Sequence, residues 1–270
     1  MSYATDLYLD LLKRCLTNFI HGEAEEELVQ SRRRFKQNIV NFMAARGIRM
    51  VRASPFDPTM RAEGKDWPPS ADSMIGLKRL DNLQFCVEDV LAHEIPGDLI
   101  ETGVWRGGAT IFMRAILKAH GVVNRTVWVA DSFEGLPRPN EAQYPQDRGD
   151  VHHSYRELAV SLEQVKANFT KYGLLDDKVR FLKGWFRDSL PGAPIKELAV
   201  LRLDGDMYES TMDALTHLYP KLSVGGYLIV DDYGAIPACK KAVHDFRAAQ
   251  GIKEEMREID WTGVFWQRLS

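Results

Sequence analysis

Cysteine is scarce in this chain, and the few cysteines form no recognisable pattern. Among 270 residues only Cys15, Cys86 and Cys239 are cysteines, and no Cys-x-x-Cys pair occurs. An odd number of widely spaced cysteines argues against both a disulfide framework and a zinc finger. We therefore expect the reducing cytoplasm as the compartment.

Strong charge and long apolar runs are missing as well. A net charge of −3 gives no electrostatic reason to expect nucleic acid or an anionic membrane as a partner. No apolar run approaches the length of a membrane-spanning helix, and the N-terminus lacks the apolar core of a signal peptide. The length of 270 residues suits one large α/β domain with an appendage, or two modest domains.

From residue 97 onward, short apolar runs alternate with helical patterns. The apolar runs predict strands at 98–104, 126–131, 179–183, 198–204 and 226–231, followed by a closing hairpin of 254–259 and 263–268. Helical patterns predict helices at 110–119, 161–172 and 208–222, the second with a capping box of Ser161 and Gln164. This alternation predicts an α/β fold with a mostly parallel sheet and an antiparallel C-terminal hairpin.

The first third of the chain reads as helices separated by a long connection. Apolar residues at helical spacing predict helices at 5–20, 24–45 and 71–93, the last with Ser70 as its N-cap, and residues 48–69 predict a proline-rich loop. The apolar faces of these helices are too short for a core of their own. We therefore expect residues 1–73 to form a helical cover and residues 74–270 to form the main domain.

Two of the predicted strands end in pairs of aspartates. One strand runs into Asp204 and Asp206, and the next runs into Asp231 and Asp232. Ligands bind beyond the carboxyl ends of the strands in open α/β sheets. Four carboxylates gathered there would repel one another unless a cation neutralised them, and oxygen ligands suit Mg²⁺ or Ca²⁺. The sequence predicts a site for a hard divalent cation.

A glycine turn follows the first predicted strand. Gly103, Gly107 and Gly108 come after Glu101 with the spacing G-x-x-x-G-G, which departs from the dinucleotide fingerprint G-x-G-x-x-G. At the end of the next strand, Asp131 can accept hydrogen bonds from a ribose diol, so the two strand ends indicate NAD or S-adenosylmethionine. Glu101 would repel a pyrophosphate yet could hold an ammonium group, which favours S-adenosylmethionine.

Several motifs together resemble the macrocin O-methyltransferase family. They are GDLIETGVWRGG (97–108), VWVADSF (127–133), GWFRD (184–188), LDGD (203–206) and GGYLIVDDY (225–233). Members of that family are metal-dependent enzymes that methylate sugar hydroxyls on antibiotic glycosides, including macrolides and aminocoumarins. The resemblance implies a Rossmann-like class I methyltransferase fold with a seven-stranded sheet, S-adenosylmethionine, and Mg²⁺ or another hard divalent cation. It also implies a small-molecule glycoside as acceptor, and we expect a homo-oligomer.

The resemblance also assigns roles to residues. Asp204, Asp231 and Asp232 match the family's metal ligands, Asp206 matches the general base, and Met74 matches a helix start that contacts the donor. The N-terminal third departs from the family, because the charged helix predicted around 32–45 looks longer than the family usually carries there, and this leaves the identity of the acceptor open. The full set of candidate donor-binding residues is Met74, Glu101, Thr102, Gly103, Gly107, Asp131, Ser132, Trp185, Asp188 and Asp204.

Residues 138–159 form a long polar connection, which we interpret as a substrate lid. Its His152 and His153 are expected to contact the acceptor or solvent, and Trp185 with Phe186 could flank the adenine ring. Two alternatives stay open. The glycine spacing and the absence of a Tyr-x-x-x-Lys pair in the expected context argue against an NAD-dependent oxidoreductase. The clustered aspartates argue against a non-catalytic binding protein.

Overall fold

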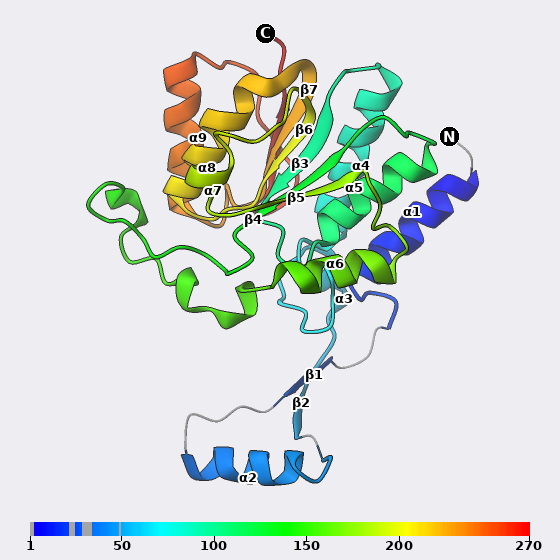
Figure 1. Cartoon of the computed structure of the whole chain (residues 1–270), viewed down its shortest axis with the longest axis vertical. Helices are drawn as coiled ribbons and strands as arrows, with labels where there is room; N and C mark the ends of the chain where they lie inside the picture. Colours follow the sequence, from blue (N-terminus) through cyan, green and yellow to red (C-terminus); the bar gives the residue numbers. More distant parts are fainter. Residues whose placement is uncertain (1–2, 22–24, 29–33, 49) are drawn as a thin grey trace.

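A seven-stranded sheet with helices on both faces forms the body of the protein (Figure 1). The computed structural model describes residues 3–21, 25–28, 34–48 and 50–270. The strands of this sheet are β3 (Asp98–Thr102), β4 (Val127–Asp131), β5 (Val179–Lys183), β6 (Leu198–Leu203), β7 (Leu222–Val230), β8 (Arg257–Glu258) and β9 (Val264–Gln267). Their order is β5-β4-β3-β6-β7-β9-β8. Strands β3 to β7 pair in parallel and β9 pairs antiparallel with β7 and β8, which confirms the predicted sheet.

Two apolar cores lie on opposite faces of the sheet. The α-helices are α1 (Tyr3–Leu16), α2 (Arg34–Ala44), α3 (Pro58–Ala62), α4 (Gly76–Ala92), α5 (Gly108–Ala119), α6 (Leu162–Lys171), α7 (Phe186–Ser189), α8 (Tyr208–Leu218) and α9 (Pro237–Gln250). One core joins α1, α4, α5 and α6 to the sheet, and the other joins α8 and α9 to it (Figure 1). Every residue of β6 is buried, because helices cover both of its faces.

The strand order places a ligand-binding edge at one end of the sheet. The chain runs outward from β3 to β4 and β5 on one side, and to β6 and β7 on the other. Between β3 and β6 the strand order reverses, and a crevice opens beyond the carboxyl ends of strands at such a switch point. The loops after β3, β4, β6 and β7 therefore meet in one place.

The N-terminal third differs from the prediction. Residues 25–28 form strand β1 (Glu25–Leu28), which pairs antiparallel with β2 (Val51–Ser54), so the predicted helix at 24–45 is wrong at its start and is shorter, as α2. Residues 24 and 29–33 of that predicted helix lie outside the described residues. The proline-rich connection contains β2 and α3, whose Asp57 caps it by accepting from the N–H of Thr59 and Met60. Helical spacing alone could not show that this pairing would interrupt the helix.

Several helices also begin at residues other than those predicted. Helix α4 begins at Gly76 with Ile75 at its N-cap position, so Ser70 is not the cap, while Ser161 does cap α6 by accepting from the N–H of Gln164. Helix α9 was not predicted, although Pro237 at its first turn is a common helix start. None of the described helices is both long and apolar enough to cross a membrane.

Candidate functional site

A cavity of about 330 Å³ opens at the carboxyl ends of β3, β4, β6 and β7. It brings together residues that the sequence analysis singled out from distant parts of the chain, namely Met74, Glu101, Gly103, Asp131, Ser132, His152, Trp185, Phe186, Asp204, Asp206, Asp231 and Asp232. Thr102, Gly107 and Asp188 are not among its lining residues. Thr102 is buried at the end of β3, and Asp188 points to solvent beside Arg187.

The glycine turn after β3 lets the backbone of Gly103 lie close to that of Asp204. Gly103 has a φ of +84°, and a Cβ there would overlap the carbonyl oxygen of Asp204. Gly107, with a φ of +87°, is the N-cap of α5. Asp131 fastens the same turn, because one of its oxygens accepts from the N–H of Val104 at 2.8 Å and the other accepts from the N–H of Phe133 at 2.6 Å. The turn after β3 is thus held open toward the cavity.

Glu101 lies at the floor of the cavity, almost fully buried. Its Oε1 accepts from the Arg202 guanidinium, while its Oε2 has no hydrogen-bond partner among the described residues. A buried carboxylate oxygen without a partner is costly. A ligand that donates a hydrogen bond to this oxygen would remove that cost.

Three carboxylates meet at the ends of β6 and β7. Asp204, Asp231 and Asp232 each offer one oxygen, and these oxygens lie within 4.8 Å of one another. Asp206 follows in the left-handed region, with a φ of +57°, and its N–H donates to Asp232 at 3.1 Å. The structure therefore gathers all four aspartates that the sequence placed at two strand ends.

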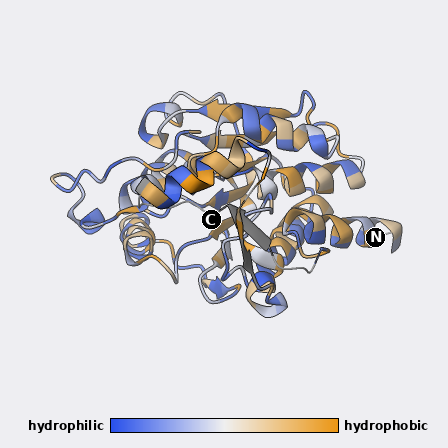
Figure 2. Ribbon diagram, turned by 90° about the horizontal axis from the view of Figure 1, so that it is seen from below, coloured by the Kyte–Doolittle hydropathy of each residue, from blue (hydrophilic) through white to orange (hydrophobic). Residues whose placement is uncertain are grey.

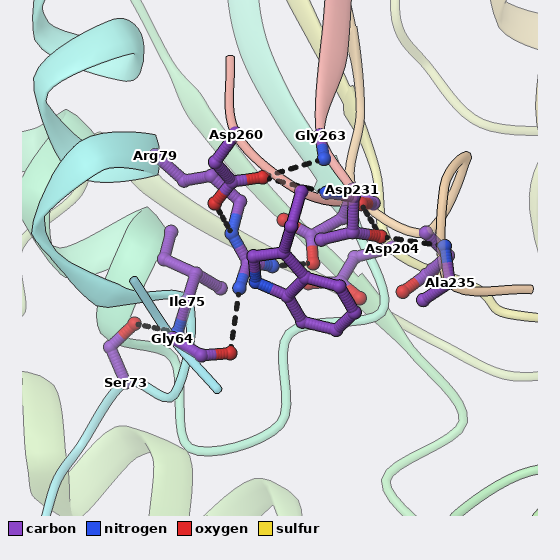
Figure 3. A network of polar contacts seen from close by, with 12 residues as sticks. Gly64, Ser73, Ile75, Arg79, Asp204, Asp231, Ala235, Asp260 and Gly263 are labelled. Atoms are coloured by element: carbon purple, nitrogen blue, oxygen red, sulfur yellow. Dashed lines mark hydrogen bonds and ion pairs between the residues drawn. The ribbon is translucent and has the colours of Figure 1, made fainter. Parts of the chain in front are cut away.

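Two buried arginines hold this cluster, and Figure 3 shows the contacts of one of them, Arg79. Arg202, on β6, donates to Glu101, to Asp204 at 2.7 Å and to Asp231. Arg79, on α4, donates to the other oxygen of Asp231 and lies 3.0 Å from Asp260. Sequence reasoning missed both arginines, although a charged residue inside the apolar run of β6 was a signal for Arg202.

Comparisons with known proteins identify the family of this chain. The family model described as "Macrocin-O-methyltransferase (TylF)" matches residues 5–268. This chain belongs to the macrocin O-methyltransferase family. The predicted family and the predicted O-methyltransferase activity are thereby confirmed, and the alternative of an NAD-dependent oxidoreductase finds no support.

Relatives of this O-methyltransferase match it over nearly their whole length. The 8-demethyl-8-(2,3-dimethoxy-alpha-L-rhamnosyl)-tetracenomycin-C 4'-O-methyltransferase of Streptomyces olivaceus is 55% identical over 99% of this chain and 94% of its own. The mycinamicin III 3''-O-methyltransferase of Micromonospora griseorubida is 50% identical, over 99% of this chain and 98% of its own. The solved structure of the O-methyltransferase NovP is 50% identical and superimposes with a TM-score of 0.86, covering 98% of this chain and all of that one.

The aspartates of this methyltransferase carry more negative charge than the site can easily hold. Burial raises the pKa of Asp204 to about 7, with the charge of Asp231 adding to the effect, and burial raises the pKa of Asp206 to about 6. The pKa of Asp232 lies well above its usual value because of burial and because of the neighbouring aspartates. A cation bound beside these carboxylates would stabilise their ionised forms and so counteract the rise in their pKa values.

The segment predicted as a lid is anchored at the start of α8, next to the loop that follows β6. Asp147, nearly fully buried, accepts from the N–H of Tyr208 and of Glu209 at the start of α8. His152 lines the cavity, and its Nδ1 lies 2.6 Å from Asp150. His153 does not line the cavity.

Aromatic side chains form the rim of the cavity. Trp67 and Trp261 line it, with 54% and 46% of their surface exposed. The Trp67 ring packs edge-on against Tyr155, 5.9 Å away, and Trp261 donates to the carbonyl of Glu63 at 2.9 Å. These contacts join the N-terminal segment, the lid segment and the C-terminal hairpin around one opening.

Proposed function

We propose that this protein transfers a methyl group from S-adenosylmethionine to a sugar hydroxyl of a natural-product glycoside, assisted by a hard divalent cation. The observation that carries the proposal is the sharing of one cavity by the glycine turn with its buried Glu101 and by the aspartate cluster. Relatives named for methylation of a tetracenomycin rhamnoside and of mycinamicin III support the acceptor class.

The donor would occupy the half of the cavity under β3 and β4. Glu101 has a free buried oxygen that suits the ammonium group of the methionine part. Asp131 would accept from the ribose hydroxyls, since its two backbone hydrogen bonds leave lone pairs available. Met74, Ser132 and Trp185 line the same space.

The cation would be held by Asp204, Asp231 and Asp232. Two oxygens on opposite sides of Mg²⁺ or Ca²⁺ lie about 4–5 Å apart, given bond lengths of about 2.0–2.6 Å. The separations of up to 4.8 Å in this cluster fit that requirement, and the donor set consists of carboxylate oxygen only. When bound, the cation supplies a Lewis acid that lowers the pKa of a nearby hydroxyl.

Asp206 would act as the general base. The acceptor oxygen forms a bond to the methyl carbon while the carbon–sulfur bond of the donor breaks, and the hydroxyl proton passes to the Asp206 carboxylate. S-adenosylhomocysteine leaves with the electron pair of the broken bond. The backbone N–H of Asp206 donates to Asp232, so the base is held beside the proposed cation ligands.

The acceptor would enter past the aromatic rim. Trp67 and Trp261 offer exposed ring faces on which the C–H face of a sugar or an apolar aglycone can pack. The lid segment at 138–159 would close over it, and residues 1–73 would cover the site from the other side. We also propose that the protein functions as a homo-oligomer.

A methyl-transfer assay tests the proposal. Labelled S-adenosylmethionine is incubated with a panel of deoxysugar glycosides that carry neighbouring hydroxyls, with Mg²⁺ or with a chelator. We expect label to reach one hydroxyl of at least one glycoside, and the chelator to abolish transfer. Transfer that is unaffected by complete chelation would disprove the role of the cation. If calorimetry showed that the protein binds NAD in preference to S-adenosylmethionine, the proposal that S-adenosylmethionine is the methyl donor would be disproved.

A further inference from the structure

One corner of the cavity lies between the turn after β5 and the start of α8. Gly205 contacts both sides of this corner, because a Cβ added to it would lie 3.2 Å from the Phe186 ring and 3.1 Å from the Cβ of Ser210. The two elements therefore enclose the corner from two sides. The side chains that line it are those of Trp185, Phe186, Arg187, Glu209, Ser210 and Asp213.

Glu209 is buried in this corner, and only one of its two carboxylate oxygens is satisfied. The residue is 4% exposed. Its Oε1 accepts from Nη1 of Arg187 at 3.0 Å, whereas its Oε2 has no hydrogen-bond partner within the described parts of the chain. A buried carboxylate oxygen without a partner is costly until a donor reaches it. Because the terminal torsion of glutamate is broad, a small rotation can turn this oxygen toward a ligand in the cavity.

The neighbours of Glu209 add acceptors and negative charge to the corner. The lid segment is mostly hydrophilic where it extends at the left of the view from below (Figure 2). Its contact at this place is Asp147, whose carboxylate accepts from the backbone N–H of Tyr208 and of Glu209. The half-buried Asp213 is acidic as well, and burial together with the charge of Glu209 raises the pKa of Asp213 to about 6. The corner is therefore suited to a group that donates a hydrogen bond.

The strand order brings the adenine of the proposed methyl donor to this corner. Glu101 at the end of β3 suits the ammonium group of the donor, and Asp131 at the end of β4 suits its ribose. Strand β5 is the next strand beyond β4 in the sheet, and the turn with Trp185 and Phe186 follows it. Since adenine is attached to the ribose on the side away from the methionine part, it extends toward the turn after β5.

Asp188 does not provide a carboxylate for the adenine, although the sequence analysis placed it among the donor-binding residues. Its side chain is 67% exposed and lies 3.6 Å from Arg187, and it does not line the cavity. Glu209 reaches the same corner from α8 and has a free oxygen there. The cavity thus holds two buried glutamates with a free oxygen, Glu101 and Glu209, and S-adenosylmethionine carries an N–H donor group at each of its two ends.

We propose that Glu209 recognises the adenine of the donor by accepting a hydrogen bond from its exocyclic amino group, while Arg187 holds the other oxygen of the carboxylate. This inference rests on the proposed S-adenosylmethionine donor and adds the residue that reads its base. Hypoxanthine, the deaminated base, carries a carbonyl oxygen at the position of the amino group. That oxygen would face the Glu209 carboxylate without a proton between them, so the site should reject inosine derivatives.

Calorimetry with two product analogues tests this role without relying on methyl transfer. The wild type should bind S-adenosylhomocysteine at least about tenfold more tightly than S-inosylhomocysteine, because a hydrogen bond to a charged group is lost with the inosine compound. In Glu209→Gln the two affinities should agree within about threefold, because an amide can either donate or accept. Asp213→Asn, at another carboxylate of the same corner, is the matched control and should keep the wild-type ratio.

The ratio of the two dissociation constants separates this inference from the proposed donor. If Glu209→Gln weakened both ligands equally and kept the wild-type ratio, the role of Glu209 would be overturned and the donor would stand. A ratio lost equally in Asp213→Asn would also overturn it, because the charge of the corner and not Glu209 would then be responsible. A wild type that binds neither compound would overturn the donor and this inference together. Thermal melts check that Glu209→Gln is folded; if it is not, Glu209→Asp withdraws the carboxylate by one methylene group and should lower the ratio in the same way.

Discussion

The carboxylate of Asp147 accepts a hydrogen bond from the backbone N–H of Tyr208 at 2.6 Å and another from Glu209 at 3.0 Å. Asp147 belongs to the lid segment, and α8 begins two residues after Asp206. The lid and the loop that carries the proposed base therefore share one buried anchor. An acidic side chain at this place is also favoured by the dipole of α8.

Asp147→Ala should separate the lid from this anchor. We expect the free energy of unfolding to fall by about 0.5–2 kcal/mol, the usual cost of losing a helix cap. The KM for the acceptor should rise while the Kd for S-adenosylmethionine stays within about twofold. Thermal melts, steady-state kinetics and calorimetry measure these three quantities. Asp147→Asn keeps one accepting oxygen, so its stability and its acceptor KM should lie between those of the wild type and of Asp147→Ala. An unchanged acceptor KM in Asp147→Ala would refute the link to the lid.

Arg202→Met should make folding depend on the cation. The variant leaves Glu101, Asp204 and Asp231 without their shared arginine, and breaking a buried ion pair from one side costs about 3–5 kcal/mol. Because a divalent cation would neutralise part of that charge, Mg²⁺ should raise the melting temperature of the variant more than that of the wild type.

Arg114 provides the matched control for that experiment. It is also buried and is paired with one carboxylate, Asp176, at 2.7 Å, away from the cavity. Arg114→Met should lower the melting temperature, and Mg²⁺ should not restore it. A rescue of equal size in both variants would mean that the cation does not act at the aspartate cluster.

Local patterns predicted much of the fold and the residues at the strand ends that line the cavity. Apolar runs that end in glycine or aspartate mark buried parallel strands, and parallel strands bring their carboxyl ends together whatever lies between them. That is why Gly103, Asp131, Asp204 and Asp231 could be placed in one site from the sequence. Parallel strand pairing alone brings these four residues close together, whatever contacts their side chains make.

Contacts made across long sequence separations could not be predicted in this way. Arg79 reaches Asp231 from 152 positions away, and no local pattern in α4 marks it. Asp147 looks like any loop aspartate until α8 packs beside it. Strand β1 consists of three glutamates and a leucine, a composition poor in strand formers, and it exists because β2 pairs with it.

His152 and Asp150 predict a pH-dependent contribution to stability. The hydrogen bond that the His152 ring donates to the Asp150 carboxylate raises the pKa of His152. Burial would raise the pKa of Asp150, but the hydrogen bonds and charge of His152 outweigh burial and lower it. Because the pKa of His152 is higher in the folded state, protonation of this histidine stabilises the folded state. The stabilisation is complete at pH values below the unfolded-state pKa of about 6.5, and it is lost as the pH rises through the folded-state pKa.

The test compares the wild type with Asp150→Asn. We expect the histidine titration followed by NMR to show a lower pKa for His152 in the variant. The difference in melting temperature should be largest near pH 5–6 and should shrink above the folded pKa. A difference that grows with rising pH would contradict the ion pair.

Asp206→Asn distinguishes a base from a fourth cation ligand. Asparagine tolerates the left-handed conformation found at this position, where φ is +57°, so the variant should keep the backbone and its hydrogen bond to Asp232. The amide cannot take the proton from the acceptor hydroxyl. We therefore expect kcat to fall by about 10²–10⁴, with the binding of S-adenosylmethionine and Mg²⁺ nearly unchanged.

Two further measurements complete this comparison. Raising the pH should restore part of the rate of Asp206→Asn, because hydroxide can then accept the proton. Asp232→Asn should show the opposite behaviour, with a higher Mg²⁺ concentration needed for activity and a smaller loss of kcat at saturating Mg²⁺. If Asp206→Asn instead loses Mg²⁺ affinity and turns over normally at saturating Mg²⁺, Asp206 is a ligand, and the base must be sought elsewhere in the cavity.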